Sequence, residues 1–141
     1  MECLCRIPVE PMNHKYLKQG GKMMEICRGD ILMVNMIEVP GTSLQKGRRP
    51  AVVISNDKAN TYSPVITVVP LTSKIKKKRY LPTHVYVSRH EMTGLVRPVL
   101  VLGEQVSAIA VQNIVQKCGH MSERAMKRIT KAVKIQLNIE D

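Results

Sequence analysis

The feature that most limits the possible folds is a series of short apolar runs separated by turn residues. Each run has the length of a single strand, and glycine, proline, asparagine and aspartate between the runs favour chain reversals. Short strands at such close spacing predict a small barrel or a tightly curved antiparallel sheet. The predicted strands lie at residues 30–39, 49–55, 65–71, 83–88, 95–102, 104–110 and 113–118.

The last part of the chain has helical periodicity instead. Ser122 is a good N-cap, and Glu123 places a negative charge in the first turn. We therefore expect a helix over residues 122–138 that packs one side against the sheet. Its apolar face consists of Met126, Ile129, Val133 and Leu137. We interpret the cations on its remaining surface as a solvated face; they are Arg124, Lys127, Arg128, Lys131 and Lys134.

The composition fits one domain with an aliphatic core and a polyanionic partner. The chain has 141 residues, 44% of them hydrophobic, but no Trp and no Phe, so Val, Ile, Leu and Met must fill the core. The net charge of +11 favours a nucleic acid or an acidic protein as partner, although a merely soluble cationic surface would give the same count. No apolar run is long enough to span a bilayer and no signal peptide is recognisable, so we expect a cytoplasmic protein.

Residues 1–24 differ from the rest because they have neither helical nor strand periodicity. We interpret them as a disordered leader or as a mis-assigned start, and residues 25–141 as the globular domain. The codons for "QGGKMM" are compatible with a ribosome-binding sequence just before Met23 and Met24, which is the reason for the second interpretation. The mass of the native N-terminus distinguishes a translation start there from a real flexible tail.

The sequence contains no recognisable metal or cofactor motif. Its cysteines have no zinc-ligand spacing, and in a cytoplasmic chain we expect them to be reduced; they are Cys3, Cys5, Cys27 and Cys118. No glycine-rich phosphate loop and no pair of carboxylates is apparent. Any catalysis is therefore expected to need no metal and no cofactor.

Two arginines stand where a flexible loop enters a buried strand. Arg48 and Arg49 precede Pro50, and a guanidinium held there offers a planar fork of donors to phosphate oxygens. Thr72 ends the next apolar strand, and its hydroxyl is a further donor. Because the two strands are consecutive and plausibly paired, we expect Arg49 and Thr72 to lie side by side. Taken alone, such an arginine is more often the flank of a salt bridge.

Other polar residues give weaker signals. The basic run at residues 74–79 is suited to a polyanion backbone, and equally to a solubilising loop. His84 lies on a predicted strand, where a histidine is more often structural than catalytic, although it could act as a base. Glu104 and Gln105 begin another predicted strand, and we expect them to form buried hydrogen bonds to the backbone.

Five stretches, in this order, resemble the MazF/PemK/Kid toxins of bacterial toxin–antitoxin systems. They are "RGDILMVNM", "GRRPAVVISND", "YSPVITVVPLTSKIKK", "LPTHVYV" and "GLVRPVLVLGEQVSAI". The resemblance implies an SH3-like antiparallel β-barrel closed by a C-terminal helix, and a homodimer. It also implies metal-independent, sequence-specific cleavage of single-stranded RNA, including mRNA. A ribose 2′-OH would attack the adjacent phosphorus and leave 2′,3′-cyclic phosphate and 5′-OH ends.

The resemblance also assigns roles to individual residues. Arg49 and Thr72 match the catalytic arginine and threonine of the family. Residues near them are expected to bind RNA: Gln45, Lys46, Arg48, Ser73, Lys74, Lys76, Lys77 and Lys78. A cognate antitoxin with an acidic segment would inhibit by occupying the RNA groove.

Two departures from the family pattern affect the expected RNA contacts. Many relatives carry "GSEQ" before the catalytic arginine, whereas this chain has the longer "GTSLQKG" without the glutamate. Relatives also often place a cation soon after "EQ", where Ser107 and Ala108 stand here. Two alternatives remain open: a gyrase-directed toxin like the CcdB poisons that share the fold, and a non-catalytic binder of nucleic acid or antitoxin.

Overall fold

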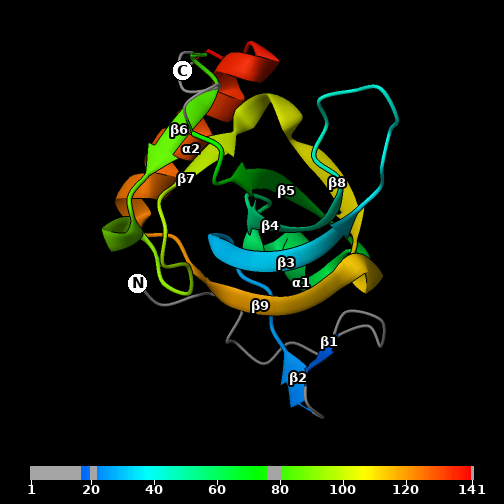
Figure 1. The fold of residues 1–141 in the computed structure, drawn as a ribbon. Helices are drawn as coiled ribbons and strands as arrows, with labels where there is room; N and C mark the ends of the chain where they lie inside the picture. The colour runs from blue at the N-terminus through cyan, green and yellow to red at the C-terminus, as the bar shows by residue number, and fades with distance from the viewer. Residues whose placement is uncertain (1–16, 20–21, 76–80, 141) are drawn as a thin grey trace.

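An antiparallel sheet curves around a buried core in the computed structural model, which describes residues 17–19, 22–75 and 81–140 (Figure 1). The long helix α2 (Glu123–Leu137) packs beside β6, and the short helix α1 (Asp57–Tyr62) follows β4. The strands are β1 (Leu17–Gln19), β2 (Lys22–Met24), β3 (Asp30–Met36), β4 (Gly47–Val53), β5 (Val65–Thr72), β6 (His84–Val87), β7 (Val99–Leu102), β8 (Ser107–Ala110) and β9 (Ile114–His120). Three 3₁₀ turns lie among them, η2 (Arg89–Glu91), η3 (Gly103–Gln105) and η4 (Val111–Asn113).

Seven of these strands form one sheet in which every pairing is antiparallel. Its strand order is β6-β7-β5-β4-β3-β9, and β8 pairs with the first half of β5. The prediction of a mainly antiparallel β fold with a C-terminal helix is therefore confirmed. Within the described residues no ladder joins β6 to β9, so closure into a barrel stays a prediction.

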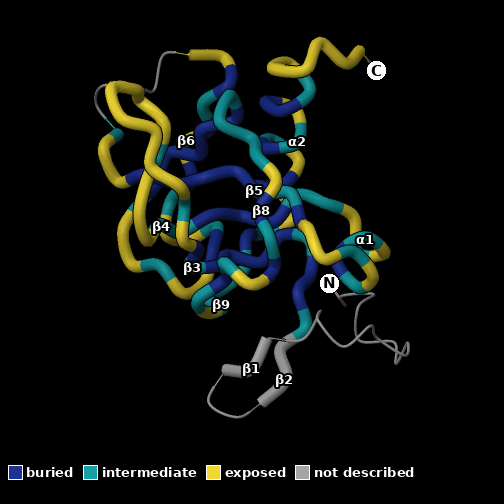
Figure 2. Tube along the Cα trace, turned by 90° about the vertical axis from the view of Figure 1, so that its right-hand side faces the viewer, coloured by how far each residue is buried: buried dark blue, intermediate teal, exposed yellow. Residues whose placement is uncertain are grey.

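Strand β5 lies at the centre of the sheet and buries side chains on both faces. Val69 and Leu71 belong to one apolar cluster, which includes Ile129 of α2, whereas Ile66 and Val68 belong to a second cluster. Burial on both faces explains why the central strands have nearly continuous apolar sequences rather than an alternating pattern. Figure 2 shows the result as a dark blue stretch along β5.

Helix α2 begins at the predicted residue. The Ser122 hydroxyl accepts a hydrogen bond from the Ala125 amide at 3.1 Å, which caps the first turn. Met126, Ile129 and Val133 are buried as predicted, but Leu137 is 53% exposed, so the expected apolar face is one turn too long. The helix stops at Asn138, whose left-handed backbone (φ 56°) ends the regular hydrogen bonding.

Local structure differs from the prediction at several places. Residues 56–64 lie between two predicted strands, where the sequence predicts a loop, but they contain α1, because the Asn56 side chain accepts from the Ala59 amide and caps a short helix. The strand expected over residues 95–102 forms only at its second half. Glu104 and Gln105 lie in η3 rather than in a strand. Gly103, the first residue of η3, packs so closely on the Thr83 carbonyl that a Cβ would not fit.

The N-terminal segment also departs from the expectation. Strands β1 and β2 pair with each other, where no regular structure was expected. Residues 1–16 lie outside the described part, so the interpretation of residues 1–24 as a leader or a mis-assigned start stays a prediction. Cys118 is a free thiol, whereas Cys27 takes part in a disulfide, so the expectation of reduced thiols is wrong for Cys27.

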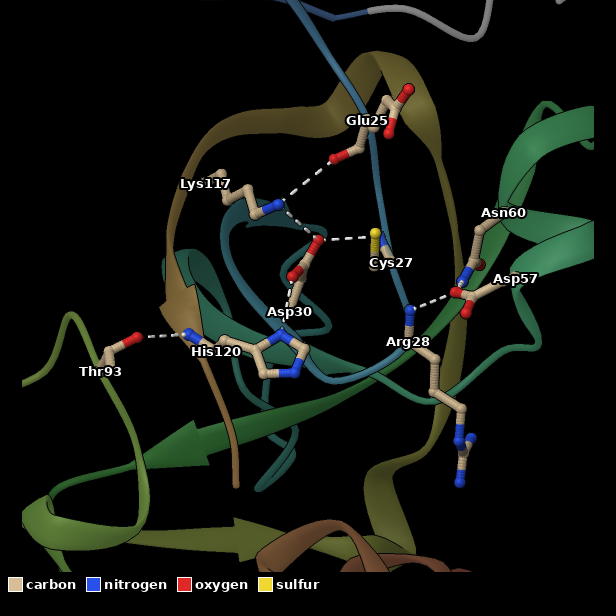
Figure 3. A network of polar contacts seen from close by, with 9 residues as sticks. All are labelled: Glu25, Cys27, Arg28, Asp30, Asp57, Asn60, Thr93, Lys117 and His120. Carbon is tan, nitrogen blue, oxygen red and sulfur yellow. Dashed lines mark hydrogen bonds and ion pairs between the residues drawn. The ribbon is translucent and has the colours of Figure 1, made fainter. Parts of the chain in front are cut away.

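A polar network holds the start of β3 (Figure 3). The Asp30 carboxylate, 2% exposed, accepts hydrogen bonds from the Cys27 amide at 2.7 Å and from His120 Nδ1 at 2.9 Å. Lys117 Nζ lies 3.0 Å from the same carboxylate. All three donors converge on one buried anion, which is the arrangement that compensates for its burial. We call Asp30, Cys27, Lys117 and His120 the Asp30 network.

Arg28 extends this structure toward both helices. Its amide donates to the Asp57 carboxylate at 2.6 Å, and its guanidinium donates to Thr130 Oγ1 of α2 at 2.6 Å and to the Ile54 carbonyl. The residues of "RGD" therefore stabilise the fold at the start of β3.

No helix among the described residues is long and apolar enough to cross a bilayer.

Candidate active site

Strands β4 and β5 bring Arg49 and Thr72 to one pocket. Ala51 pairs with Pro70, and continuing this antiparallel register by two residues places Arg49 opposite Thr72. The pocket has a volume of about 240 Å³. Its polar lining residues are Arg49, Thr72, Ser73 and Arg97, and its apolar ones are Pro50, Leu71, Leu95, Val96 and Val99. Among the described residues the lining has two guanidinium groups, hydroxyls and no acidic residue, which favours an anion such as a phosphodiester.

Thr72 is fixed by its surroundings. The residue is 3% exposed, and its backbone pairs with Leu100 of β7. Its Oγ1 accepts a hydrogen bond from the Lys74 amide at 3.1 Å. A hydroxyl has one proton to donate in addition to its acceptor sites, and accepting from Lys74 leaves that proton available to a ligand in the pocket.

Arg49 is half-buried and is oriented by the loop that precedes β4. Its Nε donates to the Lys46 carbonyl at 3.1 Å. The described residues offer no acceptor to the two terminal nitrogens of the guanidinium. A positive group that is held on one side and has unused donors on the other is suited to binding phosphate oxygens.

Arg97 is a pocket residue that sequence reasoning missed. It stands in the loop before β7 and lines the pocket together with Arg49. A signal for it was present, because "RPVLVL" repeats the pattern of "RPAVVI": an arginine, a proline and a buried strand. Each arginine is thereby held by a proline at the entry of a strand of the same sheet.

The remaining expected RNA-binding residues have different surroundings. Arg48 is exposed and pairs with Asn35 of β3, and alternation along β4 directs it to the opposite face from Arg49. Lys46 forms an exposed ion pair with Glu38 at 2.9 Å. Ser73 lines the pocket and Lys74 is exposed beside it. Lys76, Lys77 and Lys78 lie outside the described residues.

A second hollow of about 450 Å³ lies beside the loop at residues 37–46. Gln45 contributes to its lining, as do Gln105 of η3 and Asn35 and Asn113. Ser107 and Ala108, which stand where relatives often carry a cation, also line it. The hollow therefore has amide and hydroxyl groups where a phosphate-binding cation was expected from the family pattern.

His84 is a buried structural residue. Its side chain is 1% exposed, and its Nε2 lies 2.6 Å from the Glu104 carboxylate, which also accepts from Thr83 at 3.1 Å. These contacts fix η3 to β6. Glu104 is 28% exposed and its partners are side chains, so the expected buried hydrogen bonding to backbone is wrong for it. Gln105 does bond to backbone groups, those of Gln45 and Ser43, but these bonds are not buried.

One carboxylate outside the pocket has a shifted pKa. Burial alone would raise the pKa of Glu91, but hydrogen bonds from Ser88 and the guanidinium of Arg128 outweigh this effect and hold the pKa below its usual value. Arg128 also donates to the Tyr86 carbonyl at 2.8 Å, so this contact attaches α2 to the sheet.

Within residues 25–75 and 81–140, no group of His, Cys, Asp and Glu side chains is arranged to hold a metal ion.

Comparison with known proteins identifies close relatives. The family model described as "PemK-like, MazF-like toxin of type II toxin-antitoxin system" matches residues 27–137. Endoribonuclease EndoA of Bacillus subtilis is 34% identical over 118 residues, which cover 84% of this chain and 99% of the relative. Endoribonuclease MazF of Staphylococcus saprophyticus is 32% identical over 112 residues, which cover 79% of this chain and 91% of the relative.

A solved structure shares the fold. It is an endoribonuclease from Mycobacterial species in complex with its cognate antitoxin, with a TM-score of 0.63 at 17% identity. The likeness covers 83% of this chain and 97% of that one. With a family model that spans most of the chain and relatives above 30% identity, the chain belongs to the PemK-like, MazF-like toxins of type II toxin–antitoxin systems.

Proposed function

We propose that this protein is a sequence-specific endoribonuclease that cleaves single-stranded RNA, including mRNA, at the pocket of Arg49 and Thr72. The observation that carries the proposal is the presence of both residues in one pocket whose described lining contains no acidic residue. The two relatives named above are endoribonucleases that align with most of this chain. A gyrase poison or a passive binder would not need a guanidinium and a hydroxyl beside each other.

The proposed reaction is an internal transfer at phosphorus that uses no metal. The ribose 2′ oxygen forms a bond to phosphorus while the bond from phosphorus to the 5′ oxygen of the next nucleotide breaks. The products have 2′,3′-cyclic phosphate and 5′-OH ends. The 2′-OH proton passes to solvent, because His84, the other acceptor that the sequence suggested, is buried against Glu104 and away from the pocket lining.

Arg49 acts on the charge that develops at phosphorus. The pentacoordinate transition state carries more negative charge on its oxygens than the substrate does, and fixed donors stabilise it selectively. Arginine is almost never deprotonated in water, so it does not serve as the base. It stabilises the charge, gives a proton to the leaving 5′ alkoxide, which is a stronger base than guanidine, and regains that proton from solvent. Thr72 donates to a second phosphate oxygen, and Arg97 adds positive charge to the same pocket.

The proposal includes a cognate antitoxin and a homodimer. The solved relative binds its cognate antitoxin, and this chain has a net charge of +11, which suits an antitoxin with an acidic segment. Such a segment would inhibit by occupying the RNA groove at the pocket of Arg49 and Thr72. We also propose that the sheet closes as an SH3-like barrel and that the protein acts in the cytoplasm.

The test is cleavage of a long RNA of defined sequence by the purified, antitoxin-free protein in EDTA, with both product ends mapped. The proposal expects cuts at one short recurring sequence, with cyclic phosphate and 5′-OH ends. Tight RNA binding without cuts would contradict it and support a passive binder. An absence of both, with inhibition of gyrase, would support the gyrase alternative.

A further inference from the structure

The loop between β3 and β4 is exposed, yet it carries the acceptor that orients Arg49. Residues 41–44 and 46 are exposed, and Gln45 is half-buried. Within the described residues, the backbone of this loop forms hydrogen bonds to one side chain from outside the loop and its two strands. That side chain is Gln105 of η3.

Gln105 holds the loop with both ends of its amide. Its Oε1 accepts from the Gln45 amide at 2.9 Å, and its Nε2 donates to the Ser43 carbonyl at 3.2 Å. A donor and an acceptor that bind two peptide groups of one turn fix both its distance and its orientation. Lys46 follows Gln45 in the chain, and its backbone carbonyl accepts a hydrogen bond from Arg49 Nε.

The element that carries Gln105 is itself well anchored. Glu104, its neighbour, binds His84 and Thr83 of the sheet, and the Gly103 amide donates to the Thr83 carbonyl at 2.9 Å. A Cβ at Gly103 would lie 2.6 Å from that carbonyl, so no side chain fits there and the backbone of η3 packs directly on Thr83. Hydrogen bonds, together with the covalent links from Glu104 to Gln105 and from Gln45 to Lys46, therefore connect β6 through η3 and the loop to Arg49.

From this connection we propose that Gln105 is a positioning residue for the nuclease, which aims the Arg49 guanidinium by clamping the loop at Ser43 and Gln45. The inference rests on the proposed function for its effect on cleavage. Gln105 acts through the loop and does not contact the reacting phosphate in this account. Fixed placement of a catalytic group matters because a displacement of about 1 Å costs roughly 100-fold in rate.

The first test follows the loop itself and needs no RNA. In the Gln105→Ala variant the Gln45 amide loses its acceptor, so its hydrogen exchange, followed by NMR, should accelerate by about tenfold or more. Exchange in β5 and the unfolding temperature should stay near those of the wild type. Unchanged exchange at Gln45 would overturn the clamp, whether or not the protein is a nuclease.

The second test is steady-state cleavage, over a range of concentrations, of an RNA that the wild type cuts. Gln105→Ala should lower kcat by about 30-fold with little change in KM, because RNA binding groups remain while Arg49 loses its orientation. Gln105→Glu keeps an acceptor for the Gln45 amide and should recover part of the rate and the slow exchange. Gln112→Ala, an exposed glutamine of η4, is the matched control and should behave as the wild type.

The outcomes separate the inference from the proposed function. A wild type that cleaves beside a Gln105→Ala variant with the same kcat overturns the inference and leaves the nuclease in place. A wild type that binds RNA without cutting it overturns the proposed function and removes the catalytic role of Gln105 with it. If Gln105→Ala cleaved more slowly only because part of the protein was unfolded, the positioning role would also be contradicted.

Discussion

The Asp30 network and the pocket of Arg49 and Thr72 use similar groups in opposite ways. In the network, a buried carboxylate receives donors from Cys27, Lys117 and His120. In the pocket, the Arg49 guanidinium has one acceptor among the residues that the structure describes, and none of those that line the space in front of it is a carboxylate. The network neutralises its charge internally, whereas the pocket keeps unused positive donors.

This difference separates polar groups that stabilise the fold from polar groups that are available to bind a ligand. Hydrogen bonds that are completed within the protein stabilise the fold, and removing one partner leaves a buried group without compensation. Hydrogen-bond donors that have no acceptor in the folded protein contribute little to its stability, and they are available to a ligand. The two regions should therefore respond to mutation in opposite ways, in folding for one and in cleavage for the other.

The largest expected effect is on cleavage. Arg49→Ala should lower the cleavage rate by about 1,000-fold or more, because it removes the fixed positive charge at phosphorus. Urea unfolding should change by less than about 1 kcal/mol, since the half-exposed guanidinium makes one hydrogen bond.

The matched control is Arg48→Ala, one residue away on the opposite face of β4. It should weaken RNA binding in a salt-dependent way and leave kcat near that of the wild type. Equal losses of kcat in the two variants would remove the distinction between the two arginines.

The second effect is on folding. Asp30→Asn should lower the free energy of unfolding by about 2–4 kcal/mol, because Lys117 and His120 lose the anion that they share. Cleavage per folded molecule should stay close to the wild-type value. Urea denaturation measures the first quantity, and active-site titration combined with kinetics measures the second.

An exposed carboxylate provides the comparison for Asp30. Glu38 pairs with Lys46, and both side chains are more than half exposed (56% and 59%). Glu38→Gln should therefore cost about 0.5 kcal/mol or less. If this variant were as unstable as Asp30→Asn, burial would not explain the strength of the Asp30 network.

The smallest effect is a pH dependence of stability at Glu91. Its pKa is lower in the folded protein than its usual value of 4.5, so the unfolded state binds more protons and acid favours unfolding. The contribution is fully present above pH 4.5 and is lost as the pH falls through the folded pKa. Because the Arg128 side chain is 41% exposed, the total is at most about 1 kcal/mol.

Unfolding free energies of the wild type and Glu91→Gln between pH 7 and pH 3 measure this contribution. The advantage of the wild type should shrink toward acid. Parallel curves over the whole range would show that Glu91 gains nothing from Arg128.

Local patterns predicted the parts of the molecule that depend on near neighbours. The Ser122 cap and the strands around Val52 and Val69 follow from residues within one element. Arg49 and Thr72 were expected to be adjacent because their strands are consecutive in the chain. The position of Leu137 could not be predicted in the same way, because helical periodicity does not say where the partner surface ends.

Residues that join distant segments could not be derived from the sequence. Gln105 contacts a loop about sixty residues earlier in the chain, and nothing in "GEQV" indicates that partner. Arg97 reaches the pocket because β7 pairs with β5, a pairing that skips β6. His84 appeared as a potential base until its contact with Glu104 showed it to be enclosed.

The most direct test of the account follows the two regions together while RNA binds. An RNA that contains the mapped cut site, with 2′-deoxyribose at the cut so that it cannot react, is added to the labelled protein. The account predicts shifts in the NMR signals of Arg49 Nε–H and the Thr72 methyl group, with the His120 ring unchanged. RNA that binds and shifts His120 but neither Arg49 nor Thr72 would contradict it.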